Sequence, residues 1–195
     1  MNIEFWFEFG STYSYPAAMR IEALAAERGL LVTWRAFLLG PIFREQGWRD
    51  SPFNLYPAKG RYMWRDLERT CEHQGIPFRR PTVFPRSGLL AARIACRYSQ
   101  AEWLPEFVRN IYRANFAEDL DISLPETVAD CLIALGQDPE PILNETQTPD
   151  AKTLLRTQTE EASRRAIFGA PSFLVGSELF WGNDRLEEAL SWAVT

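Results

Sequence analysis

The first thirty residues constrain the fold of this chain more than any other stretch. Between residues 3 and 9 every odd position is apolar: Ile3, Phe5, Phe7 and Phe9. This two-residue period, rich in aromatic side chains, is typical of a β-strand. Gly10 interrupts it, and apolar residues then recur at helical spacing from Ala17 until Gly29 ends the run. The sequence therefore predicts a buried strand that leads into a helix through a short polar turn.

The turn between the predicted strand and helix has two interpretations. Ser11, Thr12 and Ser14 are residue types that cap helices, and Pro16 suits a first helical turn. At such a helix start, unpaired N–H groups and the positive end of the helix dipole favour an anion, including a thiolate. The turn is thus either a simple cap or an anion-binding site, and the stretch alone leaves both open.

Length and charge exclude several classes of protein. A chain of 195 residues with 46% hydrophobic residues fits one domain, or one domain with an insertion. The net charge of −5, without a long run of one sign, predicts no nucleic-acid partner. No apolar run reaches membrane-spanning length, and the strand at residue 3 leaves no room for a signal peptide. We therefore expect a cytoplasmic protein without membrane association.

The spacing of the cysteine and histidine residues does not indicate a dithiol redox site, a metal site or a catalytic triad. Cys71, Cys96 and Cys131 are far apart, with no C-x-x-C pair, and are expected to be reduced thiols in the core or at the surface. The only histidine, His73, lies at a predicted helix end, where it would interact with the helix dipole. We therefore expect neither a bound metal nor a Ser-His-Asp triad.

The rest of the chain alternates between strand-like and helical segments. A second strand is predicted over residues 30–37, followed by an irregular loop over 38–57 and a helix over 59–74. Residues 78–87 are expected to be extended. Four helices follow, over residues 89–98, 103–116, 125–135 and 138–144. The helix over 150–167, capped by Thr148 or Asp150, precedes a hairpin over 172–181. A last helix over 185–193 would be capped by Asn183 or Asp184.

Three segments together resemble one family over essentially the whole chain. They are residues 7–15 (FEFGSTYSY), 168–172 (FGAPS) and 180–186 (FWGNDRL). The chain resembles the 2-hydroxychromene-2-carboxylate isomerases, glutathione-dependent proteins related to kappa-class glutathione transferases and DsbA oxidoreductases. The resemblance implies an α/β, thioredoxin-like fold with an inserted all-helical domain. Residues 1–58 and 149–195 would form the thioredoxin-like domain, and residues 59–148 the helical insertion.

The resemblance also implies a glutathione site at the first turn. Ser11 stands where DsbA relatives carry their first cysteine, and its hydroxyl would hydrogen-bond the glutathione thiolate. That bond and the helix start should lower the pKa of the thiol. Ala170 and Pro171 are similar to the cis-proline step of thioredoxin folds, where the backbone of residue 170 would pair with glutathione as an added strand.

Further contacts follow from the resemblance. The segment Trp181, Gly182, Asn183 and Asp184 is similar to the segment that holds the γ-glutamyl end, with Asp184 pairing with the ammonium. Asn54 and Lys59 match substrate-contacting positions, since a cation suits a pyruvate carboxylate and a developing enolate. Arg44, Trp48 and Tyr62 are further substrate-binding candidates. Residues 39–44 differ from the corresponding segment of naphthalene-pathway members, which puts the substrate rather than the fold in question.

The activity implied is cis–trans isomerisation in the catabolism of aromatic compounds. A glutathione thiolate would add to the ring-opened substrate, trans-o-hydroxybenzylidenepyruvate, allow rotation, and leave again. Two alternatives stay open: a kappa-like transferase or peroxidase acting on electrophiles or hydroperoxides, and a non-enzymatic binding protein. Ser11 and Ser14 occupy both cysteine positions of the DsbA relatives, which excludes dithiol chemistry at this turn. A homodimer is compatible with the sequence.

Overall fold

A mixed four-stranded sheet forms the centre of the molecule. The computed structural model describes residues 2–195, so residue 1 of the predicted segment 1–58 lies outside the described residues. The strands are β1 (Asn2–Phe7), β2 (Leu31–Ala36), β3 (Ser172–Val175) and β4 (Glu178–Trp181), in the order β2-β1-β3-β4. β1 pairs in parallel with β2 and antiparallel with β3, and β3 pairs antiparallel with β4. The predicted strand–helix–strand unit and the predicted hairpin are confirmed.

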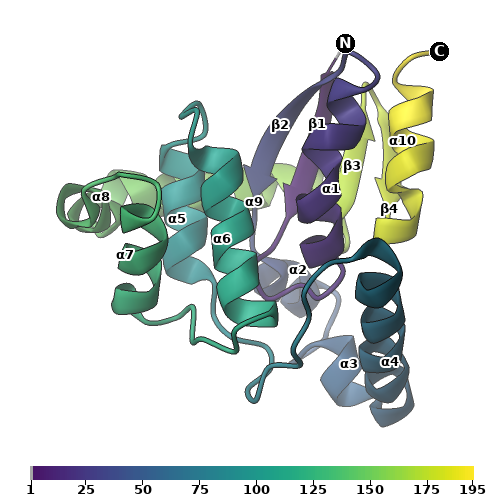
Figure 1. Cartoon of the computed structure of the whole chain (residues 1–195), viewed down its shortest axis with the longest axis horizontal. Coiled ribbons are helices and arrows are strands. Elements are labelled where there is room, and N and C mark those ends of the chain that lie inside the picture. Colours follow the sequence, from purple (N-terminus) through teal and green to yellow (C-terminus); the bar gives the residue numbers. More distant parts are fainter. Residues whose placement is uncertain (1) are drawn as a thin grey trace.

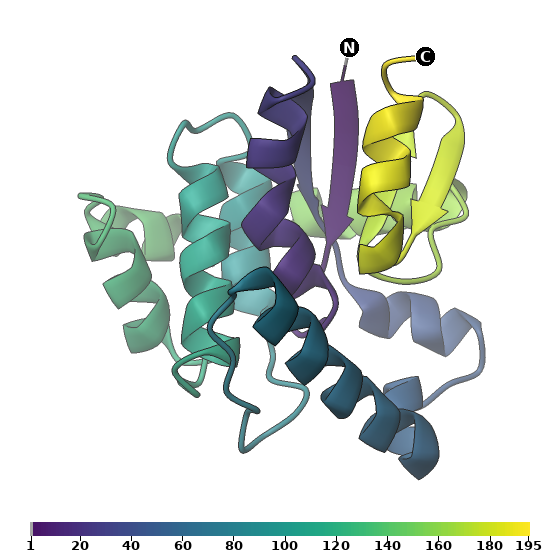
Figure 2. The same ribbon diagram turned by 45° about the vertical axis from the view of Figure 1, so that its right-hand side comes forward.

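Helices cover both faces of this sheet, because alternate residues of β1 point to opposite sides. Phe5 and Phe7 belong to the main core with α1 (Ser14–Ala26) and α10 (Leu186–Trp192). Trp6 belongs to a smaller core on the opposite face with α9 (Pro149–Arg164). In Figures 1 and 2, α1 and α10 accordingly lie on one side of the strands and α9 on the other. Every residue of β1 is therefore buried, except the exposed Asn2 and the half-buried Glu4.

A run of helices connects the two halves of the sheet. They are α4 (Pro57–Gln74), α5 (Leu89–Arg97), α6 (Leu104–Phe116), α7 (Pro125–Ile133) and α8 (Pro139–Thr146). Their positions confirm the predicted helices to within a few residues, and Thr148 caps α9 by accepting a hydrogen bond from Ala151 N–H at 3.3 Å. In Figure 1, α7 and α8 lie farthest from the strands. The division into domains at residues 59 and 148 stays a prediction. None of the helices within residues 2–195 has the length and apolar composition needed to cross a membrane.

The prediction of an irregular loop over residues 38–57 was wrong. Two short helices occupy it, α2 (Leu39–Glu45) and α3 (Pro52–Leu55). Pro41 and Pro52 lie in their first turns, where a missing N–H breaks no helical hydrogen bond. Ser51 Oγ caps α3 by accepting from Phe53 N–H at 3.3 Å. The prolines that indicated an irregular loop therefore lie at the starts of helices.

The predicted caps at two helix starts are also corrected. No side chain caps α1, although Ser11 Oγ accepts a long hydrogen bond of 3.4 Å from Ser14 N–H. The last helix begins as a 3₁₀ turn, η1 (Asn183–Arg185), and neither η1 nor α10 has a side-chain cap. Asn183 and Asp184 are therefore not held in place by a capping role.

Candidate functional site

A single cleft of about 1370 Å³ gathers most of the predicted site residues. Its walls come from the turn after β1, helices α2 to α4, the segment before β3, and the β4–η1 junction. The predicted residues that line it are Ser11, Arg44, Trp48, Lys59, Tyr62, Ala170, Trp181, Gly182, Asn183 and Asp184. Segments that are more than a hundred residues apart in sequence thus meet around one cavity.

Ser11 and Ala170 are in direct contact. The Ser11 hydroxyl donates a hydrogen bond of 2.9 Å to the Ala170 carbonyl oxygen. The Ser11 N–H is held separately, by the Glu8 carbonyl oxygen at 3.0 Å. The peptide bond between Ala170 and Pro171 is cis, as predicted, and the Pro171 carbonyl accepts from Gly182 N–H at 3.0 Å. The first turn and the β3–β4 hairpin therefore form one connected edge of the cleft.

Two glycines shape the wall around Trp181. The Trp181 ring is 53% exposed and packs edge-on against Phe168, with ring centroids 4.9 Å apart. A Cβ atom on Gly169 would lie 2.3 Å from Trp181 Nε1, so only glycine lets the indole take this position. Gly182 has a φ of +115°, a conformation that L side chains rarely adopt.

Asn183 and Asp184 differ in how firmly they are held. The Asn183 Oδ1 accepts a hydrogen bond of 3.0 Å from the Arg20 guanidinium of α1. Arg20 also contacts Glu187 of α10 at 3.3 Å, which ties the two helices to the site. The Asp184 carboxylate is mostly exposed and lies 3.8 Å from Arg185, a distance typical of a loose surface pair. Asp184 is thus free to meet a charged group in the cleft.

The opposite end of the cleft is aromatic and cationic. Trp48 packs against Phe43 with ring centroids 5.5 Å apart, and Lys59 Nζ lies 5.3 Å from the centre of the Tyr56 ring. Arg44, Arg49 and Tyr62 line the same cleft. Flat apolar surfaces beside cations suit an aromatic ligand that carries a carboxylate.

Of the predicted contact residues, Pro171 is buried and does not line the cleft. Asn54 does not line the cleft either. Its amide donates to both carboxylate oxygens of Asp50 at 3.2 Å and is exposed. Asp50 itself lines the cleft. The reason that Asn54 does not is helix α3, whose first turn directs Asn54 back toward the preceding loop.

Tyr13 and Asp66 form a cleft contact that the sequence reasoning missed. The Tyr13 hydroxyl donates to the Asp66 carboxylate at 2.9 Å, and Asp66 also meets Arg69 at 3.2 Å. Burial, and then Asp66, raise the pKa of Tyr13. The contact links the start of α1 to α4, and nothing in the sequence spacing indicated it.

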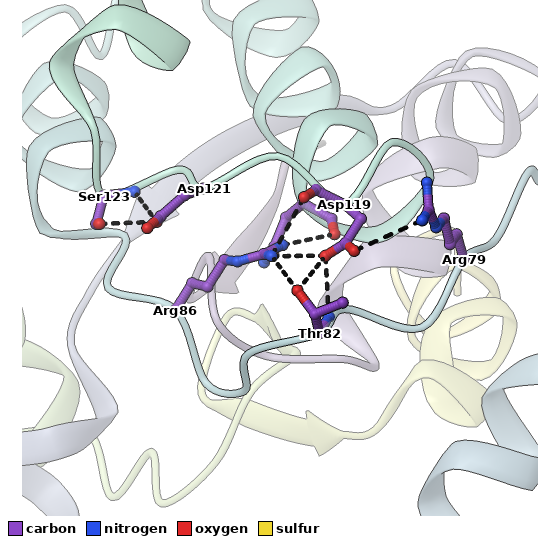
Figure 3. Close-up of polar contacts among 7 residues, drawn as sticks. Arg79, Thr82, Arg86, Asp119, Asp121 and Ser123 are labelled. Carbon is purple, nitrogen blue, oxygen red and sulfur yellow. Dashed lines mark hydrogen bonds and ion pairs between the residues drawn. The ribbon is translucent and has the colours of Figure 1, made fainter.

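The segment before α5 was expected only to be extended, but Phe84 to Ser87 border the cleft. Figure 3 shows how a polar network holds the segment, with Arg86, Asp119 and Thr82 converging. The buried Arg86 guanidinium lies 2.5 Å from the Asp119 carboxylate and also contacts Asn115, whose amide donates to the Phe9 carbonyl at 3.3 Å. The pKa of Asp119 is lowered by the hydrogen bond from Thr82 N–H and by Arg86. This network fixes the segment against the Phe9–Gly10 turn.

Glu8 is a second site residue that the sequence reasoning missed. The alternating pattern of the strand predicts that Glu8 points away from the core into solvent. In the structure it is partly buried and lines the cleft. Its Oε2 accepts a hydrogen bond of 2.9 Å from Gly10 N–H. Burial raises the pKa of Glu8 to about 7, although the hydrogen bonds from Gly10 and Ser11 oppose that rise. Glu8 therefore titrates near neutral pH.

This raised pKa predicts a pH-dependent change in stability. The native state binds more protons than the unfolded state between pH 4.5 and about 7, so wild-type stability falls as pH rises through that window. Above it we expect Glu8→Gln to be more stable than wild type by about 2 kcal/mol, after allowing for partial solvent exposure. At pH 4.5 or below, the difference should vanish. Urea unfolding across this range measures it.

The matched control for this measurement is Glu178→Gln, an exposed glutamate on β4. It should change the free energy of unfolding by less than about 0.5 kcal/mol at every pH. A constant difference between Glu8→Gln and wild type across the whole range would contradict a raised pKa at Glu8.

The three cysteines lie away from this chemistry. All are buried and free, and burial raises the pKa of Cys71 and Cys96 to about 12 and that of Cys131 to about 11. Of the core and surface locations that the sequence left open, all three occupy the core, and their raised pKa disfavours the reactive thiolate. His73 lies in the last turn of α4. Within residues 2–195, no group of three His, Cys, Asp or Glu side chains could hold a metal ion.

Comparison with known proteins relates the whole chain to one family. Residues 2–191 match the DSBA-like thioredoxin domain. A 2-hydroxychromene-2-carboxylate isomerase of Pseudomonas putida is 32% identical over 95% of this chain and 91% of its own length. Glutathione S-transferase kappa 1 of Caenorhabditis elegans is 26% identical over 94% of this chain and 87% of its own.

A solved structure gives the same relation. A 2-hydroxychromene-2-carboxylate isomerase superposes with a TM-score of 0.86 at 28% identity, over 98% of this chain and 94% of that chain. These matches confirm the predicted fold class, a thioredoxin-like α/β fold of the DsbA type with many additional helices.

Proposed function

Because this chain belongs to the 2-hydroxychromene-2-carboxylate isomerase family of DSBA-like thioredoxin proteins, we propose that it is a glutathione-dependent isomerase. Its substrate would be of the 2-hydroxychromene-2-carboxylate or trans-o-hydroxybenzylidenepyruvate type, in the catabolism of aromatic compounds. The observation that carries the proposal is the cleft, which is lined both by a serine at a helix start and by aromatic and cationic side chains.

The residues around Ser11 fit glutathione. The Ser11 hydroxyl lies 2.9 Å from the Ala170 carbonyl, so a peptide-like ligand that reaches one also reaches the backbone of the other. The start of α1 favours an anionic sulfur. The exposed Asp184 carboxylate can pair with the ligand's ammonium, while Trp181, Gly182 and Asn183 line the same wall. Bound glutathione would supply the nucleophile for the reaction.

Each side chain of the cleft then has a specific task. The Ser11 hydroxyl would turn from the Ala170 carbonyl to donate to the sulfur, which lowers the pKa of the thiol. Lys59 and Arg44 would hold the substrate carboxylate and stabilise negative charge on its oxygen atoms. Trp48 and Tyr62 would bind the aromatic ring. Because Asn54 lies outside the cleft, it could contribute only by orienting Asp50.

The test is turnover with and without glutathione. Purified protein is given trans-o-hydroxybenzylidenepyruvate, and its conversion to the chromene form is followed by absorbance. We expect activity that requires glutathione and saturates with it, without net consumption of glutathione. Full activity in its absence would overturn the proposal.

A second candidate is a kappa-like transferase or peroxidase, favoured by the similarity to glutathione S-transferase kappa 1. It would use the same Ser11 turn but consume glutathione stoichiometrically. Assays with an aryl halide and with an organic hydroperoxide separate the two. Stoichiometric loss of glutathione with either compound, and none with the chromene substrate, would favour the transferase.

The proposal includes a cytoplasmic location, where glutathione keeps thiols reduced. The three free cysteines of this chain fit such a compartment.

The position of Trp181 gives a further prediction. In Gly169→Ala the new Cβ must displace the indole, because it would lie 2.3 Å from Nε1 and 3.0 Å from Cε2. We expect glutathione to bind about tenfold more weakly, which corresponds to about 1.4 kcal/mol. Calorimetric titration measures the affinity.

Gly40→Ala is the control, since Gly40 lines the same cleft and its nearest contact would be Arg44 at 3.7 Å. That variant should bind as wild type does. If Gly169→Ala binds glutathione as tightly as Gly40→Ala, Trp181 does not belong to the binding site.

A further inference from the structure

Glu8 lies at the centre of the Ser11 turn without a role in the proposed reaction. Its side chain accepts from Gly10 N–H at 2.9 Å, and its backbone carbonyl accepts from Ser11 N–H at 3.0 Å. The same carbonyl accepts from the Tyr112 hydroxyl of α6 at 2.9 Å. The backbone on both sides of the carboxyl group is therefore fixed. Glu8 and Ser11 line the same cleft.

The charged groups around Glu8 leave its carboxylate without a cationic partner among residues 2–195. Arg86 lies on the segment packed against Gly10, but its guanidinium forms an ion pair with Asp119 instead. Tyr112 stays neutral, because burial and then Glu8 raise its pKa. The other charged residues of the cleft are Arg44, Arg49, Asp50, Lys59, Asp66, Asp184 and Arg185. A carboxylate that is partly buried, unpaired and open to a cleft is a candidate proton acceptor.

We propose that Glu8 accepts the proton that a glutathione thiol loses when it binds beside Ser11. This inference rests on the proposed function and adds a residue to it. The S–H bond breaks, its electron pair stays on sulfur, and the proton bonds to a carboxylate oxygen of Glu8. When glutathione leaves as a thiol, Glu8 returns the proton. No other reactant is needed.

The energetics suit such a transfer. The pKa of Glu8, about 7, lies about 1.5 below that of an ordinary thiol, so the transfer is uphill by that difference until the Ser11 hydroxyl and the start of α1 lower the pKa of the thiol. An ionised Glu8 would repel a thiolate in the same cleft. A protonated Glu8 is neutral, so the transfer removes this repulsion as it creates the thiolate.

The test counts protons. Glutathione is titrated into the protein at about pH 7.5 in buffers of different ionisation enthalpy, which yields the protons released per ligand bound. Thiolate absorbance in the ultraviolet measures the ionised sulfur in the same samples. In wild type we expect about 0.2 proton released per thiolate formed, because repulsion by the thiolate keeps Glu8 fully protonated in the complex. The thiol loses about 0.9 proton, and Glu8, about a quarter protonated beforehand, takes up about 0.75. In Glu8→Gln we expect about 0.9, because the proton must go to solvent.

The variant Glu8→Gln keeps an acceptor for Gly10 N–H, and Glu178→Gln serves as the matched control, with release as in wild type. Thiolate formation with about 0.9 proton released in both wild type and Glu8→Gln would overturn the role of Glu8 and leave the proposed function intact. Absence of thiolate in wild type would instead contradict the proposed function itself. Low release in wild type and high release in Glu8→Gln alone supports Glu8 as the acceptor.

Discussion

Replacing Ser11 with alanine should raise the pKa of bound glutathione by about 1 to 2 pH units and slow turnover about a hundredfold. In the proposed complex, the hydroxyl that now lies 2.9 Å from the Ala170 carbonyl would donate a hydrogen bond to the sulfur. A hydrogen bond to a charged acceptor contributes about 1.5 to 3 kcal/mol, and loss of one donor to a reacting anion costs about a hundredfold or more in rate. Thiolate absorbance against pH and steady-state turnover measure the two effects.

Ser87→Ala is the control for this substitution. Ser87 also lines the cleft and is exposed, but it lies on the segment before α5 rather than at the start of α1. Its replacement should change neither the thiol pKa nor the rate by more than about twofold. If Ser11→Ala and Ser87→Ala behave alike, thiol activation does not depend on the Ser11 hydroxyl.

Replacing Phe5 with alanine should destabilise the protein by about 4 kcal/mol, through lost burial and the cavity left behind. Phe5 has no exposed surface and lies in the middle of the sheet. Its ring stacks on Phe173 at 5.5 Å and meets Trp34 edge-on at 5.1 Å, so strands on both sides of β1 lose a partner. For a chain of this length the melting temperature should fall by about 12 °C. Urea unfolding gives the free energy directly.

Leu31→Ala provides the comparison, because Leu31 lies on the neighbouring strand β2 and is 75% exposed. It should cost less than about 0.5 kcal/mol. A loss below about 1 kcal/mol for Phe5→Ala would mean that the aromatic cluster around β1 does not carry the stability of the sheet.

The elements that sequence predicts well are those whose pattern is local. The period of β1 and the helical repeat after Gly10 are visible in a dozen residues, and the strand and α1 follow them closely. A proline, by contrast, does not show from the local sequence alone whether it lies in a loop or in the first turn of a helix. Pro41 and Pro52 end one element as readily as they begin the next, so the short helices α2 and α3 were missed.

The site is predictable only where a motif carries it. Ser11, Ala170 and Asp184 come from three motifs of one family, and all three line the cleft. Glu8 lies inside the first of these motifs but was given no role, because its burial arises from tertiary packing. Asp66 lies in none of the motifs, and its contact with Tyr13 also arises from tertiary packing. Asn54 shows the reverse error, since helix α3 directs its amide away from the cleft.

The measurement that tests the central claim most directly is a titration with glutathione, followed by calorimetry and by thiolate absorbance in the ultraviolet. We predict saturable binding at millimolar glutathione or below, with a thiolate signal that grows in proportion to the bound fraction. Binding that produces no thiolate, or no binding at millimolar glutathione, would contradict a glutathione-activating site at Ser11.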